Sequence, residues 1–241
     1  MNGTIQLSSF VDRWMFKRVG TPAALFSLVF GGVIASVTPM AAQGSTGMKT
    51  ILVLGDSLSD GFGLRRSDAY PALLVDKLRA EGLKYEIINA SQSGGTTAEG
   101  LRRLPPHLKR PIDIFILQLG VNDFFRSIPI RQIRENLQTI IDEVRRKNPG
   151  VRIIIAGLEV PNYSARDYVA DFIQMYADLA AKNGATLVPS LLEGVMGSPN
   201  LTLPDGIHPN AAGQKILAEN VWRYLEPIAQ EVASAAPAHH L

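Results

Sequence analysis

The stretch ILVLGDSLSDGFG, residues 51–63, joins an apolar run to a glycine and a group of small polar residues. The run Ile-Leu-Val-Leu predicts a strand that is buried on both faces. Gly55 ends this strand, and Asp56 and Ser57 are residue types that often begin a helix as N-caps. The stretch therefore predicts a strand-to-helix turn that presents the Ser57 hydroxyl at the carboxyl end of the strand.

The same alternation of strand and helix continues along the chain. Strands are predicted at residues 49–56, 85–91, 113–120, 151–160 and 185–190, and helices at 69–82, 97–108, 130–150, 167–184 and 210–232. Repeated strand-helix units predict a parallel sheet with helices on both faces. Five units fit a three-layer, doubly wound α/β fold with strand order 2-1-3-4-5, whose ligands bind at the carboxyl ends of the strands.

The first 45 residues do not resemble part of this core. Arg13, Lys17 and Arg18 precede an apolar segment that ends among small residues, which is the pattern of a secretory signal peptide with cleavage near residues 41–42. The apolar part is about 16 to 18 residues long, at the lower limit for spanning a bilayer, so an uncleaved N-terminal anchor is the alternative. Both interpretations place the folded domain outside the cytoplasm, periplasmic or secreted in the first case and membrane-anchored in the second.

We expect residues 1–45 to be a signal peptide or anchor with a short linker, 46–232 to be one folded domain, and 233–241 to be a disordered tail. Removal of residues 1–42 takes away three of the 24 basic and one of the 22 acidic residues, which leaves 21 of each. A neutral body gives no electrostatic reason to expect a nucleic-acid partner.

Several cofactor classes lack their sequence signals. The chain has no cysteine, which excludes disulfides, thiolate metal sites and a cysteine nucleophile. A phosphate-binding G-x-x-x-x-G-K-[ST] motif and a complete dinucleotide glycine motif are absent, as is the G-x-S-x-G nucleophile elbow. One histidine near one aspartate is too little for a zinc site. We therefore expect neither a metal nor a cofactor.

Polar residues follow the predicted strands at their carboxyl ends. In the order 2-1-3-4-5 the first strand lies between the second and the third, so Gly94 and Asn122 flank Ser57. A serine that attacks a carbonyl needs donors where negative charge develops, and the N–H groups of Ser57 and Gly94 and the Asn122 amide can supply them. A turn at Gly94-Gly95 and a helix start at Asn122 are the structural alternatives.

The general base is identified by elimination among four histidines. His239 and His240 lie in the predicted tail, and His107 has no acidic neighbour in sequence, whereas His208 follows Asp205 by three residues. Asp205 can accept the Nδ1 proton of His208, which leaves Nε2 to take the proton of the serine. Asp56 and Asp123, beside Ser57 and Asn122, are expected to bond turn N–H groups around the site.

Four blocks, GDSLSDG, the glycine of NASQSGGTT, GVND and DGIHPN, resemble in this order the SGNH, or GDSL, hydrolase superfamily. The segments YPALL, LQLGVND and VPNY look most like its periplasmic thioesterase I, lysophospholipase L1 and arylesterase group. The resemblance covers residues 49–227. It implies Ser57 as the nucleophile, Gly94 and Asn122 as oxyanion donors, and Asp205 and His208 as the rest of a triad.

The sequence departs from this group at one position, and the role of one loop has two interpretations. Gly95 stands where the group often has aspartate, so the choice of Gly94 over Gly95 rests on alignment. Pro161, Asn162 and Tyr163 match a loop that borders the substrate in the family, and a proline turn with an asparagine cap explains them equally well.

The sequence thus predicts a serine hydrolase that cleaves carboxylic esters, such as aryl esters and lysophospholipids, and acyl thioesters. A carbohydrate O-acetylesterase and, with a decayed site, a non-catalytic binding module on the same fold are the alternatives. The expected partner is a small-molecule or lipid acyl ester. We expect a monomer, with the membrane involved only in export or anchoring.

Overall fold

The computed structural model describes residues 47–160 and 166–235. Its strands are β1 (Lys49–Gly55), β2 (Tyr85–Asn89), β3 (Ile114–Gln118), β4 (Arg152–Ala156) and β5 (Thr186–Val188). All pairings between neighbouring strands are parallel, and the order is β2-β1-β3-β4-β5. The predicted fold is confirmed. The central strands β1, β3 and β4 are almost fully buried, and the edge strands β2 and β5 are mostly half-buried.

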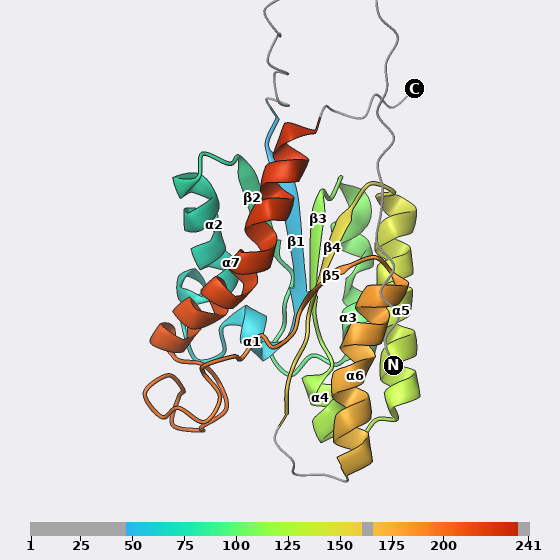
Figure 1. Cartoon of the computed structure of the whole chain (residues 1–241), viewed down its shortest axis with the longest axis vertical. Coiled ribbons are helices and arrows are strands. Elements are labelled where there is room, and N and C mark those ends of the chain that lie inside the picture. The colour runs from blue at the N-terminus through green and yellow to red at the C-terminus, as the bar shows by residue number, and fades with distance from the viewer. Residues whose placement is uncertain (1–46, 161–165, 236–241) are drawn as a thin grey trace, which may run out of the picture. The chain divides into compact units, whose positions relative to one another are not determined.

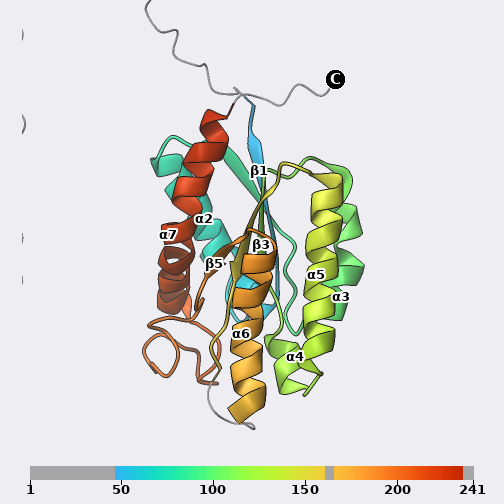
Figure 2. The same ribbon diagram turned by 45° about the vertical axis from the view of Figure 1, so that its right-hand side comes forward.

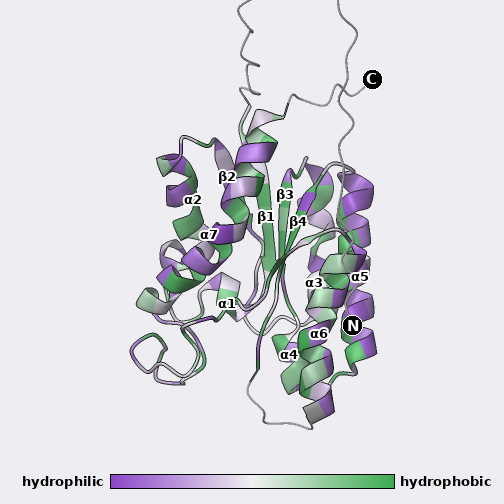
Figure 3. Ribbon diagram, viewed as in Figure 1, coloured by the Kyte–Doolittle hydropathy of each residue, from purple (hydrophilic) through white to green (hydrophobic). Residues whose placement is uncertain are grey.

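Helices form the outer two layers of this fold. The longer ones are α2 (Tyr70–Ala80), α3 (Thr97–Arg103), α5 (Ile130–Lys147), α6 (Arg166–Lys182) and α7 (Ala211–Ser234). Helices α2 and α7 cover one face of the sheet, and α3, α5 and α6 cover the other (Figures 1 and 2). The central strands are mostly apolar, whereas the helices carry both polar and apolar residues (Figure 3). No helix among the described residues is both long and apolar enough to cross a bilayer.

The short helices lie in the connections between these longer elements. They are α1 (Ser57–Asp60), α4 (Val121–Phe125) and the 3₁₀ helices η1 (Arg66–Asp68) and η2 (Pro105–Lys109). Helices α1 and α4 follow β1 and β3 at the carboxyl edge of the sheet, where the site is predicted. β1 begins and α7 ends at the opposite edge, at the top of Figure 1.

Most elements differ from their predicted ranges by one to three residues at an end, and two of them end four or five residues early. β4 ends at Ala156 because its partner β5 ends at Val188, and the apolar run continues to residue 160 because Leu158 and Val160 are buried beyond the sheet. The helix predicted at 97–108 stops at residue 103, and a 3₁₀ turn begins at Pro105, which lacks the N–H that a continuing helix needs.

The structure describes only part of the segments predicted at the two ends of the chain. α7 continues to Ser234, two residues beyond the domain end predicted at residue 232. The rest of the predicted tail, from residue 236, and the predicted signal peptide or anchor at 1–45 lie outside the described residues.

Candidate active site

Ser57 is the first residue of α1, two residues after β1 ends. Asp56 is the N-cap, and its side chain accepts a 3.0 Å hydrogen bond from the Leu58 N–H. A Cβ at Gly55 would lie 2.5 Å from Ser59 Oγ, so glycine allows the turn to pack this closely. The turn predicted from the sequence thus places Ser57 at the carboxyl edge of the sheet.

His208 and Asp205 meet Ser57 from a loop about 150 positions further along the chain. Ser57 Oγ lies 3.0 Å from His208 Nε2, and His208 Nδ1 lies 2.7 Å from Asp205 Oδ2. Both distances are in the range of normal hydrogen bonds. The structure therefore aligns the hydroxyl, the imidazole and the carboxylate in the order that a nucleophile, a base and an orienting acid require.

The Asp205 carboxylate is held by its own loop. Asp205 Oδ1 accepts hydrogen bonds from the N–H groups of Ile207, at 2.9 Å, and His208, at 3.0 Å. These bonds lower the pKa of Asp205 to about 2, and the bond from the His208 N–H makes the largest contribution. An ionised carboxylate at Nδ1 favours the tautomer with the proton on Nδ1, so Nε2 is free to accept the Ser57 proton.

The turn after β2 distinguishes between the two candidate glycines. The Gly95 N–H donates to Gln92 O at 3.0 Å, whereas the Gly94 N–H donates to no group in the described part of the chain. Gly94 has a φ of 75°, and an added Cβ would meet nothing within 4 Å, so its backbone conformation explains the glycine. The free N–H favours Gly94 over Gly95 as a donor to a ligand.

Asn122 lies in the first turn of α4 beside this turn. Its Nδ2 donates to Gly95 O at 3.0 Å, which fixes the amide plane and leaves the second Nδ2 hydrogen for another acceptor. The Ser57 N–H donates to no group among the described residues. The three N–H groups predicted for an oxyanion hole thus belong to loops that the structure brings to one edge of the sheet.

A family model described as GDSL-like lipase/acylhydrolase matches residues 53–216, which include all of these loops. The chain belongs to this family. The resemblance predicted from the sequence motifs is therefore confirmed, and with it the enzyme class, a hydrolase that acts on ester bonds.

Relatives of this GDSL hydrolase carry names from the expected group. Esterase TesA of Pseudomonas aeruginosa is 39% identical over 207 residues, which cover 84% of this chain and 98% of the relative. An arylesterase of Vibrio mimicus is 35% identical and covers 73% of this chain and 88% of its own. Thioesterase 1/protease 1/lysophospholipase L1 of Escherichia coli is 36% identical, with 74% and 84% covered. The crystal structure of TesA superposes with a TM-score of 0.71 at 38% identity and covers 75% of this chain and 99% of that one.

Two side chains that sequence reasoning missed tie the loops of this hydrolase together. Asp60 in α1 accepts hydrogen bonds from the N–H of Ser93, at 3.1 Å, and from its hydroxyl, at 2.8 Å. Arg103 in α3 donates to Ala90 O, at 3.1 Å, and to Gly55 O. Asp60 lies in the quoted motif and could have been found there. Arg103 carries no sequence signal, since it resembles its exposed neighbour Arg102.

Asp56 and Asp123 bond N–H groups of the turns, as predicted. Asp123 accepts from the Thr97 N–H at 2.8 Å and from its hydroxyl at 2.6 Å. Asp56 is fully buried, and this burial raises its pKa to about 7, although the Leu58 N–H, the Gln118 amide and the Arg103 guanidinium act in the opposite direction. Pro161, Asn162 and Tyr163, the predicted substrate-bordering loop, lie outside the described residues.

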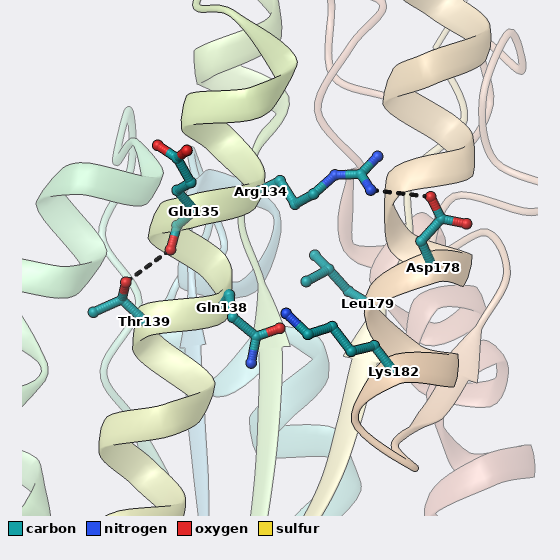
Figure 4. Close-up of a pocket in the computed structure, with 7 residues that line it drawn as sticks. All are labelled: Arg134, Glu135, Gln138, Thr139, Asp178, Leu179 and Lys182. Atoms are coloured by element: carbon teal, nitrogen blue, oxygen red, sulfur yellow. Dashed lines mark hydrogen bonds and ion pairs between the residues drawn. The ribbon is translucent and has the colours of Figure 1, made fainter.

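A separate hollow opens between α5 and α6 (Figure 4). Its lining consists of Arg134, Glu135, Gln138, Thr139, Asp178, Leu179 and Lys182. An ion pair of 3.2 Å joins Arg134 to Asp178 across it, and the Thr139 hydroxyl donates to Glu135 O at 2.8 Å. This hollow includes none of the predicted site residues, and the one hydroxyl in its lining, that of Thr139, bonds a backbone oxygen.

Proposed function

We propose that this hydrolase cleaves carboxylic esters, among them aryl esters and lysophospholipids, and acyl thioesters through an acyl-enzyme formed on Ser57. The observation that carries the proposal is the continuous hydrogen-bonded series from Asp205 through His208 to Ser57, at 2.7 Å and 3.0 Å. Such a series activates a hydroxyl that is otherwise a weak nucleophile at neutral pH.

In the first half of the reaction, His208 Nε2 takes the Ser57 proton while Oγ attacks the acyl carbon. The carbonyl electron pair moves onto its oxygen, and the N–H groups of Ser57 and Gly94 and the Asn122 amide stabilise the resulting oxyanion. When the tetrahedral intermediate collapses, the bond to the leaving oxygen or sulfur breaks. His208 then returns the proton to the leaving alcohol or thiol.

In the second half, water attacks the acyl-enzyme in the same way. His208 takes a proton from the water, the hydroxide adds to the acyl carbon, and the ester bond to Ser57 Oγ breaks. His208 gives the proton back to Ser57, and the carboxylic acid leaves. The ionised Asp205 stabilises the imidazolium in both halves, because its lowered pKa keeps the carboxylate charged at neutral pH.

Two observations support an apolar acyl or aryl substrate. Phe125 in α4, three residues after Asn122, and Ile207, next to His208, are 55% and 56% exposed, respectively. The relatives named above are an esterase, an arylesterase and a thioesterase 1/protease 1/lysophospholipase L1. For an exported enzyme, lysophospholipids and short or medium acyl and aryl esters are more accessible than acyl-CoA, which is a cytosolic metabolite.

We also propose that the domain works in the periplasm or outside the cell. The basic, apolar and small-residue pattern of residues 1–45 supports export. Expression of the full chain, followed by cell fractionation and N-terminal sequencing, tests this. A mature N-terminus near residues 41–42 in the periplasm supports a cleaved signal, full-length protein in the membrane fraction supports the anchor, and full-length protein in the cytosol contradicts both.

A series of nitrophenyl esters of increasing acyl length, with lysophosphatidylcholine, an acyl thioester and an acetylated polysaccharide alongside, tests the activity. We expect Ser57→Ala to lower kcat by roughly a millionfold, while the exposed Ser67→Ala, a matched control in η1, keeps wild-type activity. More than a tenth of wild-type activity in Ser57→Ala would contradict the nucleophile. Activity confined to the polysaccharide would favour the O-acetylesterase alternative.

A further inference from the structure

Phe62 lies against the face of the His208 imidazole. The two ring centroids are 4.4 Å apart, and the ring planes are inclined by 36°. This separation is at the short end of the range for interacting aromatic rings. Phe62 is nevertheless 46% exposed, so burial in the core does not explain its position.

The backbone around Phe62 is tied to the proposed nucleophile. The N–H groups of Gly61 and Phe62 both donate to Ser57 O at 3.1 Å. Gly61 and Gly63, on either side, have φ angles of 81° and 74°, which side chains other than glycine rarely adopt. The backbone of Phe62 is thus held close to Ser57 by two hydrogen bonds and two glycine turns.

The same turn packs on the loop that carries His208. A Cβ at Gly63 would lie 2.8 Å from Leu203 Cδ1, so the two loops are in close contact at this point. Leu203 in turn donates its N–H to His208 O at 2.7 Å. Phe62 therefore bridges the segment of the proposed nucleophile and the segment of the proposed base.

The His208 ring turns about its Cβ–Cγ bond, and this rotation moves both ring nitrogens away from their partners. The bonds of Nδ1 to Asp205, at 2.7 Å, and of Nε2 to Ser57, at 3.0 Å, depend on the orientation of the ring. A side chain on the ring face opposes the rotation. Phe62 is in contact with that face.

We propose that Phe62 is a positioning residue that holds the His208 ring in the orientation for proton transfer with Ser57. The inference rests on the proposed role of His208. Loss of the Phe62 ring should lower kcat and leave substrate binding unchanged, because Phe62 acts through the imidazole and not on the substrate. For the same reason the decrease in kcat should not depend on the acyl group.

The test compares Phe62→Leu, which keeps apolar bulk without a flat ring, with Phe62→Tyr, which keeps the ring. For Phe62→Leu we expect kcat to fall about tenfold, as the loss of an aromatic pair suggests. KM should stay within about twofold, and the loss should be the same for nitrophenyl acetate and octanoate. Phe62→Tyr should restore kcat to within about twofold of wild type.

Thermal unfolding of both variants shows whether the fold is kept, and the exposure of Phe62 predicts a small change in Tm. A kcat of Phe62→Leu within twofold of wild type, a loss in Phe62→Tyr as large as in Phe62→Leu, or a loss that grows with acyl length would overturn the inference. His208→Ala, measured alongside, separates the two proposals. If it keeps wild-type activity the proposed function fails, and if it is inactive while Phe62→Leu is unaffected only the positioning role fails.

Discussion

Replacing Asp56 with asparagine removes a buried titratable group directly beside Ser57. Asparagine is as good an N-cap as aspartate, so its Oδ1 can still accept the Leu58 N–H and keep the start of α1. The variant therefore isolates the ionisation of Asp56. Because Asp56 touches none of the reacting atoms in the proposed mechanism, we expect the variant to keep ester hydrolysis.

The pKa of Asp56 gives the sign and the size of the expected change in the free energy of unfolding. Burial raises it from an ordinary value of 3.8 to about 7 in the folded protein. Between these two pH values the folded chain holds a proton that the unfolded chain has lost, so the free energy of unfolding of the wild type falls as pH rises. A gap of about three pH units at about 1.4 kcal/mol per unit amounts to roughly 4 kcal/mol. Asparagine does not titrate, so the variant does not lose this free energy. Between pH 4 and pH 8 its free energy of unfolding should therefore rise relative to that of wild type by roughly 4 kcal/mol.

Thermal unfolding followed by circular dichroism at pH 4 and pH 8 measures the effect. For a domain of this size, roughly 4 kcal/mol corresponds to about 8 to 16 °C in Tm. At each pH the Tm of wild type is subtracted from the Tm of Asp56→Asn, and the two differences are then compared. Any effect of asparagine that does not depend on pH cancels in this comparison. Asp76→Asn, whose side chain is 73% exposed, is the matched control and should show the same Tm difference at both pH values. A Tm difference for Asp56→Asn that changes by less than about 2 °C between pH 4 and pH 8 would refute the reasoning.

Three further outcomes follow from the same structure. Asn122→Ala should lower kcat for a nitrophenyl ester by about 10² to 10³ with KM nearly unchanged, since it removes one oxyanion donor; an unchanged kcat would remove Asn122 from the oxyanion hole. Asp205→Asn should lower kcat about 10⁴-fold by presenting a donor to Nδ1 and reversing the His208 tautomer, and a loss of less than tenfold would contradict the orienting role. Gly213→Ala should destabilise the fold by about 1 to 3 kcal/mol in chemical denaturation, because the added Cβ would lie 2.2 Å from Leu201 O. Gly150→Ala is the control and should not destabilise the fold, since its Cβ would have no atom within 4 Å. Equal effects of the two variants would contradict the packing around α7.

Much of the fold could be predicted because its signals are local. The buried strands read as continuous apolar runs, and the strand-helix repeat permits few topologies for a parallel sheet. The strand ends then indicated where Ser57 and Asn122 would lie. The boundaries were less accurate, since β4 ends where its partner β5 ends, and this depends on pairing between segments that lie apart in the sequence.

The sequence by itself determined the sheet order, the edge that carries the site, and the residues Ser57, Asp205 and His208 as candidates, because residue types at strand ends are local information. Only the tertiary structure decided that the Gly95 N–H is bonded to Gln92 O while the Gly94 N–H has no acceptor among the described residues. It also decided that the Phe62 ring lies on His208. These features depend on the paths of loops and on contacts between side chains distant in sequence, and neither periodicity nor spacing along the chain records them.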